Sequence, residues 1–216
     1  MKSLLVSAVA LACVMQSASA IEVSLGPAIG AKATVNTVDP GTGLKTGFTF
    51  NNMPDLGLTT RLMFAKDMNL GLALDIEMTG YGYIMRPENA DVANDANTYV
   101  TRHSAITIAP SLYLGGLMLG VGISLPGSQT TKSVDGNSEY TINGEVESPV
   151  LEARIGAMFP VMRGKTGDLN VTIRGSYMLG GHYTTDVRTY PTALNTTNPS
   201  SAGISLGLNY LFHVVQ

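Results

Sequence analysis

The chain has 216 residues, of which only 13% are charged, and its formal net charge is −3 at pH 7. That charge content is low for a soluble protein, and without a basic excess there is no electrostatic footprint for nucleic acid. The one cysteine, Cys13, excludes a disulfide within the chain.

The first 20 residues read as an export signal. Lys2 gives a positive start, residues 4–15 are apolar, and Ala18 and Ala20 are the small residues that a signal peptidase reads. Cleavage would leave Ile21 as the first residue. The apolar stretch is shorter than the ~20 residues that a membrane-spanning helix needs, so an uncleaved anchor is the weaker alternative. Lipidation at Cys13 is a further alternative, but the preceding residues fit it poorly.

Eight stretches after the signal alternate apolar and polar residues, which is typical of β-strands with one apolar face. In the first stretch, Leu25 and Ile29 lie on one face, and Gly26 and Gly30 on the other. The stretches cover residues 21–36, 58–66, 69–85, 98–114, 117–125, 146–161, 169–184 and 202–215.

The gaps between these strands are alternately short and long. The short gaps lie at residues 67–68, 115–116 and 164–167, and Gly115-Gly116 is typical of a tight hairpin. The long gaps are residues 37–57, 86–97, 126–145 and 185–201, which are rich in loop-forming residues. This pattern predicts an all-β fold, an eight-stranded antiparallel up-and-down transmembrane β-barrel that occupies residues 21–216.

The polar face of the strands distinguishes a membrane barrel from a soluble one. A water-facing exterior is normally rich in charged residues, yet here this face contains small residues such as Gly26, Ala28, Gly120 and Gly122. An eight-stranded barrel has room inside only for its own side chains. The small and polar face therefore suits the lumen, and the bulky apolar face is predicted to contact lipid.

The last strand carries the sharpest local signal. Residues 206–214 alternate outward apolar residues with the aromatics Tyr210 and Phe212. This ending resembles the C-terminal strand of the eight-stranded outer-membrane barrel family that includes the OmpA transmembrane domain and OmpX-like proteins. The resemblance implies a monomer in the bacterial outer membrane. Its partners would be outer-membrane lipid, lipopolysaccharide and, during insertion, the barrel-assembly machinery.

Strand parity places acidic and basic residues in equal number inside the barrel. The predicted lumen residues are Glu22, Lys32, Arg61, Asp75, Glu77, Glu152, Arg154 and Arg174. Buried charges are costly unless they are paired, so the balance predicts an ion-paired plug. We expect Arg61 to reach Asp75 across the hairpin. A gated or selective pore is the alternative.

Outward aromatics fit girdles at the membrane interfaces, and simple contact with lipid is the preferred interpretation of the same positions. These are Phe64, Tyr177, Tyr183, Tyr210 and Phe212.

Catalytic, metal and cofactor sites are not predicted. Asp75 and Glu77 could form a glycosidase pair, but no cleft is evident and Arg61 is expected beside them. His103 and Ser104 are adjacent, so they face opposite sides of a strand and cannot act together. The sequence favours a structural or surface-interaction protein whose loops form the working surface. A small-solute channel and a lipid-modifying enzyme remain alternatives.

Overall fold

The structure is a computed structural model that describes residues 21–51, 53–65, 69–89, 91, 93–190 and 194–215. The predicted signal, residues 1–20, lies outside these ranges. Every regular element in the described ranges is a β-strand. None of the described residues forms a helix that is long and apolar enough to cross a membrane.

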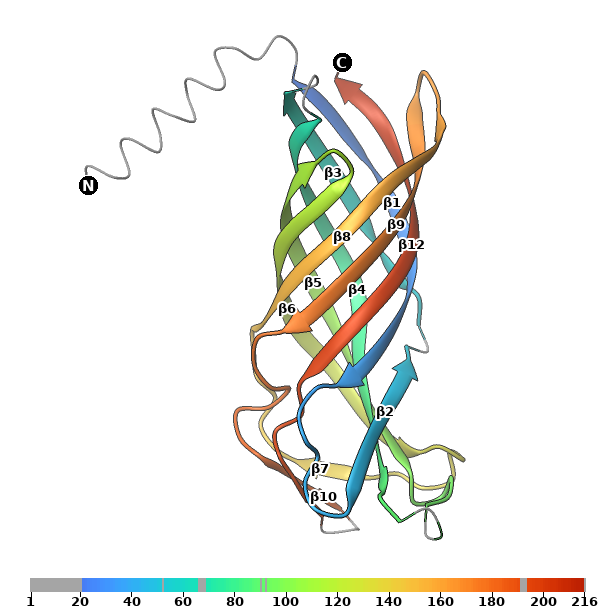
Figure 1. Cartoon of the computed structure of the whole chain (residues 1–216), viewed down its shortest axis with the longest axis vertical. Coiled ribbons are helices and arrows are strands. Elements are labelled where there is room, and N and C mark those ends of the chain that lie inside the picture. The colour runs from blue at the N-terminus through green and yellow to red at the C-terminus, as the bar shows by residue number, and fades with distance from the viewer. Residues whose placement is uncertain are drawn as a thin grey trace, which may run out of the picture.

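The described residues form twelve strands, most of which are labelled in Figure 1. They are β1 (Glu22–Asn36), β2 (Leu44–Phe50), β3 (Asp55–Ala65), β4 (Leu70–Pro87), β5 (Tyr99–Leu114), β6 (Leu117–Ser133), β7 (Thr141–Asn143), β8 (Val150–Arg163), β9 (Gly167–Met178), β10 (Val187–Tyr190), β11 (Leu194–Thr196) and β12 (Ser201–Val215).

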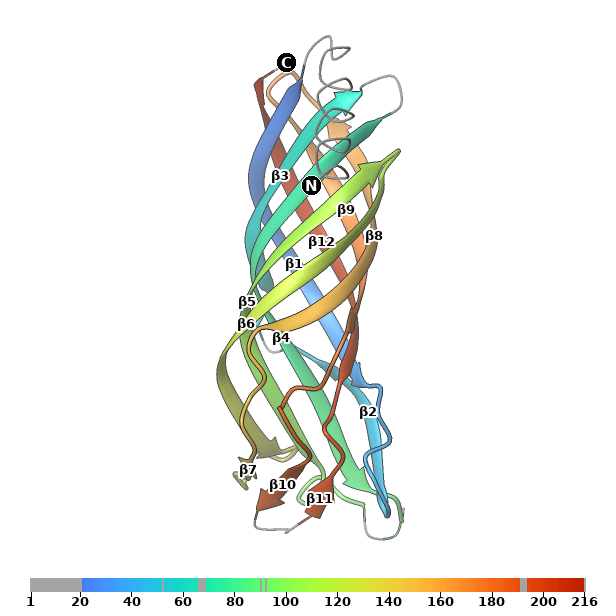
Figure 2. The ribbon, with the colours of Figure 1, turned by 90° about the vertical axis from the view of Figure 1, so that its left-hand side faces the viewer.

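The long strands close into a ring. Each pairs antiparallel with its neighbours in the order β12-β9-β8-β6-β5-β4, β2 and β3 together fill the next position, and β1 then pairs with β12. The wall therefore has eight strand positions, and the predicted eight-stranded antiparallel barrel is confirmed. β1 begins and β12 ends at the same end of the barrel as the short turns (Figure 1). We call this end of the barrel the turn end. The long connections and the small sheet β11-β10-β7 lie at the opposite, loop end (Figure 2).

The turn between β5 and β6 depends on two glycines. Gly115 and Gly116 have φ angles of 59° and 94°, a left-handed conformation that other residues rarely adopt. Two consecutive positive φ values are what a tight hairpin of this type requires. The glycine pair in the sequence was therefore a reliable sign of the turn.

Burial alternates along each strand. On β4, Leu72 and Ile76 are 48% and 45% exposed on the outer face, whereas Asp75 and Glu77 are 4% and 9% exposed in the lumen. The outward apolar positions on β5 run over residues 106–114, close to the 9–11 residues that a tilted strand needs to cross a bilayer. Closer to the loop end, Ser104 and Arg102 take the outward positions. The barrel thus carries an apolar outer band with polar residues on its loop-end side, as a transmembrane barrel does.

The strands extend further toward the loop end than their sequence pattern indicates. β6 continues to Ser133, although the predicted run ends at residue 125. The sequence pattern stops early because Thr130, Thr131 and Lys132 are polar on both faces, so hydrophobicity no longer alternates there. For the same reason β2 lies within residues 37–57, which were predicted to be loop. In contrast, β8 begins at Val150 and β9 ends at Met178, inside the predicted runs.

The wall is interrupted between β2 and β3. Asn51, Met53 and Pro54 lie outside both strands, so β1 and β4 have no continuous strand between them at this level. The Thr34 hydroxyl donates to the Gly82 carbonyl at 2.8 Å and accepts from the Gly82 amide at 3.1 Å. Asn51 donates through its side-chain nitrogen to the Gly80 carbonyl at 2.8 Å. Side chains therefore satisfy the backbone groups that the interrupted strand leaves free.

Candidate functional site

The inward residues of β4 trace the lumen from one end to the other. From the turn end they are Ala73, Asp75, Glu77, Thr79, Tyr81, Tyr83 and Met85, and all are buried. Each contacts residues from other strands, which divides the lumen into layers of different chemistry.

Arg61 on β3 is the centre of the first layer. Its Nη2 atom lies 3.5 Å from Glu22 Oε1 and 3.6 Å from Asp168 Oδ2, and His213 Nε2 lies 3.4 Å from the same Asp168 oxygen. Tyr113 packs against the guanidinium, with 5.7 Å between its ring centroid and Arg61 Cζ. Arg61 lies opposite Ala73 in the sheet and is therefore diagonal to Asp75, as the sequence predicts. The expected contact between the two charged groups is wrong, because Arg61 pairs with Glu22 and Asp168 instead.

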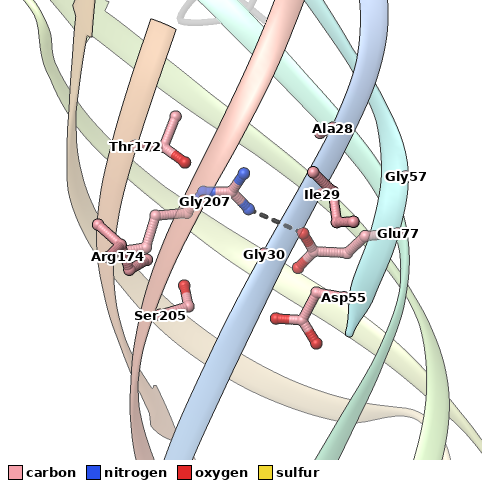
Figure 3. Close-up of a pocket in the computed structure, with 11 residues that line it drawn as sticks. Ala28, Ile29, Gly30, Asp55, Gly57, Glu77, Thr172, Arg174, Ser205 and Gly207 are labelled. Carbon is pink, nitrogen blue, oxygen red and sulfur yellow. Dashed lines mark hydrogen bonds and ion pairs between the residues drawn. The ribbon is translucent and has the colours of Figure 1, made fainter. Parts of the chain in front are cut away.

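The second layer joins β4, β8 and β9 by charge-assisted hydrogen bonds. Arg154 donates to Glu152 at 2.7 Å and to Glu77 at 2.5 Å. Arg174 donates to the other Glu77 oxygen at 2.8 Å (Figure 3). It also lies 3.6 Å from Asp75. None of these side chains is more than 14% exposed. Glu77 therefore connects two arginines from neighbouring strands, and the layer bridges the bore.

Lys32 and Tyr81 form the third layer. The Lys32 ammonium lies 3.7 Å from the centroid of the Tyr81 ring, a cation–π contact. The Tyr81 hydroxyl donates to Glu152 at 2.5 Å, and Thr79 donates to Asp55 at 2.7 Å. This layer links the second layer, which we call the arginine layer, to the aromatic residues at the loop end.

Aromatic rings close the loop end of the lumen. The rings of His103 and His182 stack with centroids 4.5 Å apart, and the hydroxyls of Tyr83 and Tyr183 lie 3.2 Å apart. We call these four residues the aromatic cap. Tyr183 was predicted to face lipid, but it is only 1% exposed inside the cap, so that prediction is wrong. It follows Gly180 and Gly181, where β9 has ended and strand parity no longer applies.

His182 also contacts a serine that the sequence did not indicate. Its Nε2 atom lies 2.7 Å from Ser201 Oγ, and the two residues are 3% and 1% exposed. The adjoining pocket has a volume of about 10 Å³, which is too small for a substrate. His182 lies in the loop after β9, where burial holds the pKa of its imidazole well below the ordinary value of 6.5. It therefore acts as a neutral hydrogen-bonding group.

The spaces left between the layers are small. Pockets lined by Asp75, Glu77, Arg154 and Arg174 have volumes of about 10 to 20 Å³, room for roughly one water molecule each. Small residues make this close packing possible. At Gly122, for example, a Cβ atom would overlap the Glu152 carboxylate.

The lumen contains more acid than base. The predicted eight charged residues all line it, and Asp55 and Asp168 join them, so the described residues place six carboxylates against four cationic side chains. The prediction of equal numbers is therefore wrong. Both additional acids fell in stretches taken as loop or turn. Their parity was informative, since Asp55 shares the face of Gly57 and Arg61, and Asp168 that of Arg174.

Four of the five aromatics predicted for the girdles lie on the outer face. Tyr177 and Phe212 are 50% and 51% exposed, and Phe64 and Tyr210 are partly exposed. Tyr210 and Phe212 contact each other, with ring centroids 4.7 Å apart. Phe48, Phe50 and Phe159 are further exposed aromatics, which were not among the predicted girdle residues.

The structure does not bring together the residues of the two catalytic pairs considered from the sequence. Asp75 and Glu77 both lie against Arg174 rather than facing a cleft. His103 is buried, whereas Ser104 is exposed and hydrogen-bonds Ser128 on the outer face. In the part of the chain that the structure describes, no group of three or more His, Cys, Asp or Glu residues could hold a metal ion.

The sequence matches no protein-family profile and no curated protein. Several solved structures of outer-membrane proteins are similar to it in fold. OprG from Pseudomonas aeruginosa matches with a TM-score of 0.37 and 13% identity, over 89% of this chain and 94% of that one. AlkL, determined in DMPC lipid bilayers, matches with a TM-score of 0.42 and 12% identity, over 89% and 90%. Ail of Yersinia pestis, solved with the heparin analogue sucrose octasulfate, matches with a TM-score of 0.34 and 14% identity, over 88% and 99%. The likeness concerns the arrangement of the strands alone.

Proposed function

We propose that this protein is an outer-membrane barrel of structural or surface-interaction type, with a closed lumen and with its long loops outside the cell. The apolar outer band supports a membrane location, and the predicted export signal supports export from the cytoplasm. With the turn end in the periplasm, the loop end is the surface that meets other molecules. Outer-membrane lipid and lipopolysaccharide are then its immediate partners.

The arginine layer is the observation that carries this proposal. Arg154 and Arg174 join Glu77, Glu152 and Asp75 across the bore, and the remaining spaces hold about one water molecule each. A solute could pass only if these ion pairs separated, which would leave buried charges unpaired. The barrel is therefore built as a scaffold for its loops.

Conductance in planar bilayers tests the closed lumen. The wild-type protein, refolded from residue 21 onward, is expected to give no large steady current, because the ion-paired layers leave no continuous water path. An eight-stranded barrel of similar size with an open bore serves as the positive control. A large, steady single-channel current from the wild type would contradict the proposal.

A cation-selective channel is the second candidate, favoured by the excess of carboxylates in the lumen. Six acids against four bases give the bore a net negative charge, and rings of carboxylates favour cations. If current does flow, its reversal potential in a salt gradient should have the sign expected for cation selectivity. Replacing Asp55 by Asn should then weaken that selectivity.

A further inference from the structure

A groove opens on the outer face of the barrel, and its lining also includes Thr79, Tyr81 and His103 from the lumen layers. It has a volume of about 270 Å³ and lies where the chain leaves the wall between β2 and β3. Met53, Leu56 and Met78 line one part of it, and Arg102, Ser104 and Ser128 line another. The groove is larger than the ~150 Å³ cavity that holds a benzene molecule in other proteins, so it has room for part of an acyl chain.

The groove lies at the boundary of the apolar band. Met53, Leu56 and Met78 are 62%, 44% and 56% exposed and belong to the lipid-facing side. On β5, the outward positions change from Ile106 in the band to Ser104 and Arg102 beyond it. A molecule in the groove would therefore meet apolar side chains at one end and polar side chains at the other, as an amphiphile does at a membrane surface.

Arg102 provides the charge of the polar end. It lies between Gly82 on β4 and Thr130 on β6, and its side chain packs where Gly82 offers none. Its Nε atom is buried without a hydrogen-bond partner, and no carboxylate lines the groove in the described part of the chain. Burying part of a guanidinium without an anion is unfavourable, so the site is complementary to an anionic group.

We propose that this groove binds an anionic membrane lipid, with its phosphate group at Arg102 and one acyl chain against Met53, Leu56 and Met78. The inference rests on the proposed function, because lipid surrounds the groove only if the barrel spans a membrane. The guanidinium suits a phosphate, since its N–H groups form a fork that matches two phosphate oxygens. Ser104 and Ser128 supply hydroxyls beside it.

Lipid quenching of a single tryptophan tests the proposal directly. The chain has no tryptophan, so Met53→Trp at the rim of the groove gives one reporter in the refolded barrel. In vesicles of unlabelled phosphatidylcholine, a small fraction of brominated phosphatidylglycerol should quench this residue more than the same fraction of brominated phosphatidylcholine. A single partly exposed arginine near the membrane surface should give a preference of roughly fivefold.

Variants of the reporter protein separate the groove from the general surface. Arg102→Gln should abolish the preference for phosphatidylglycerol. Arg86→Gln, which removes an exposed arginine from the neighbouring strand β4, should leave it unchanged. A separate protein with Ser104→Trp as its single tryptophan should show a smaller preference for phosphatidylglycerol, because the indole ring would itself fill the groove. Free inorganic phosphate should leave the quenching of the Met53→Trp protein unchanged, because the acyl chain is part of the ligand.

A second reporter distinguishes failure of this inference from failure of the proposed function. Ile155 is 65% exposed on β8, away from the groove, so Ile155→Trp should be quenched equally by the two lipids. If brominated phosphatidylglycerol and brominated phosphatidylcholine quenched each of the two reporters equally, the lipid site would be overturned, but the membrane barrel would not. If neither lipid quenched the Ile155→Trp protein, both proposals would be overturned.

Discussion

Arg154 is the residue that joins most of the lumen network. It donates to Glu77 and Glu152, and Glu152 in turn accepts from Tyr81. The sequence predicted that Glu152 and Arg154 share a face, because they are two residues apart on one strand. It could not predict the bond to Glu77, since that contact depends on how far β4 and β8 approach each other across the closed ring.

Replacing Arg154 by Met should lower the free energy of unfolding by about 3 to 5 kcal/mol, because Glu152 is left buried without its cationic partner. Urea unfolding in lipid bilayers, followed by tyrosine fluorescence, measures the change. Arg163→Met is the matched control, since Arg163 is exposed on the same strand, and it should change stability by less than about 0.5 kcal/mol. Equal effects of the two substitutions would show that the network contributes nothing.

His182 makes the aromatic cap sensitive to acid. Its folded pKa is depressed, so the opened loop binds a proton more readily than the closed cap, and stability is lost as the pH falls below the ordinary value of 6.5. The groups that face His182 are Tyr81, Tyr83, Tyr183 and His103 by ring contact, Ser201 by hydrogen bond and Lys32 by its charge.

Amide hydrogen exchange measures this effect. The amide of His182 donates to Pro199 and that of Thr184 to Glu145. After correction for intrinsic rates, both should exchange faster at about pH 5 than at about pH 7.5, the range over which an exposed histidine gains its proton. His182→Asn should remove most of the pH dependence, whereas His213→Asn at the turn end should not. Protection that is independent of pH in the wild type would refute the assignment.

At the scale of elements, the sequence predicted strands well where one face meets lipid. β4 and β5 have nearly their predicted bounds, since bulky apolar residues alternate with small or polar ones along them. The interruption between β2 and β3 was not predicted, because Thr46, Gly47 and Thr49 show no alternation of hydrophobicity. Asp55 therefore fell in a predicted loop and was not recognised as a lumen residue. The groove beside Arg102 could not be predicted for the same reason.

Thr34 is expected to stabilise the wall at this interruption. Thr34→Val removes the hydroxyl that pairs with both backbone groups of Gly82, so unfolding free energy should fall by about 1 to 3 kcal/mol. Thr46→Val is the matched control on β2, because the Thr46 hydroxyl is buried without a partner in the described structure. Its loss should be neutral or slightly stabilising. Urea titrations of the two variants in the same lipid would compare them, and a Thr34 variant as stable as wild type would argue against the bridge.

The whole molecule is organised by which face of each strand meets lipid. The lumen network and the lipid groove both follow from that orientation. Composition alone favoured it, since the inward face carries glycine, serine and a few charged residues rather than a dense charged exterior. The long loops remain the least predictable part, because β7 and β10, which pair with each other, lie far apart in the sequence and no local pattern reveals that pairing.

A cysteine scan along β4 and β5 tests this orientation most directly. The chain from residue 21 onward has no cysteine, so single substitutions can carry a fluorescent label in the refolded barrel. Cysteines at Leu72, Leu74 and Ile108, which are 48%, 37% and 41% exposed, should be quenched by a lipid-soluble quencher. Cysteines at Ala73, Thr107 and Ala109, which are at most 2% exposed, should not. Quenching of the second set in place of the first, or quenching without alternation, would contradict the transmembrane barrel.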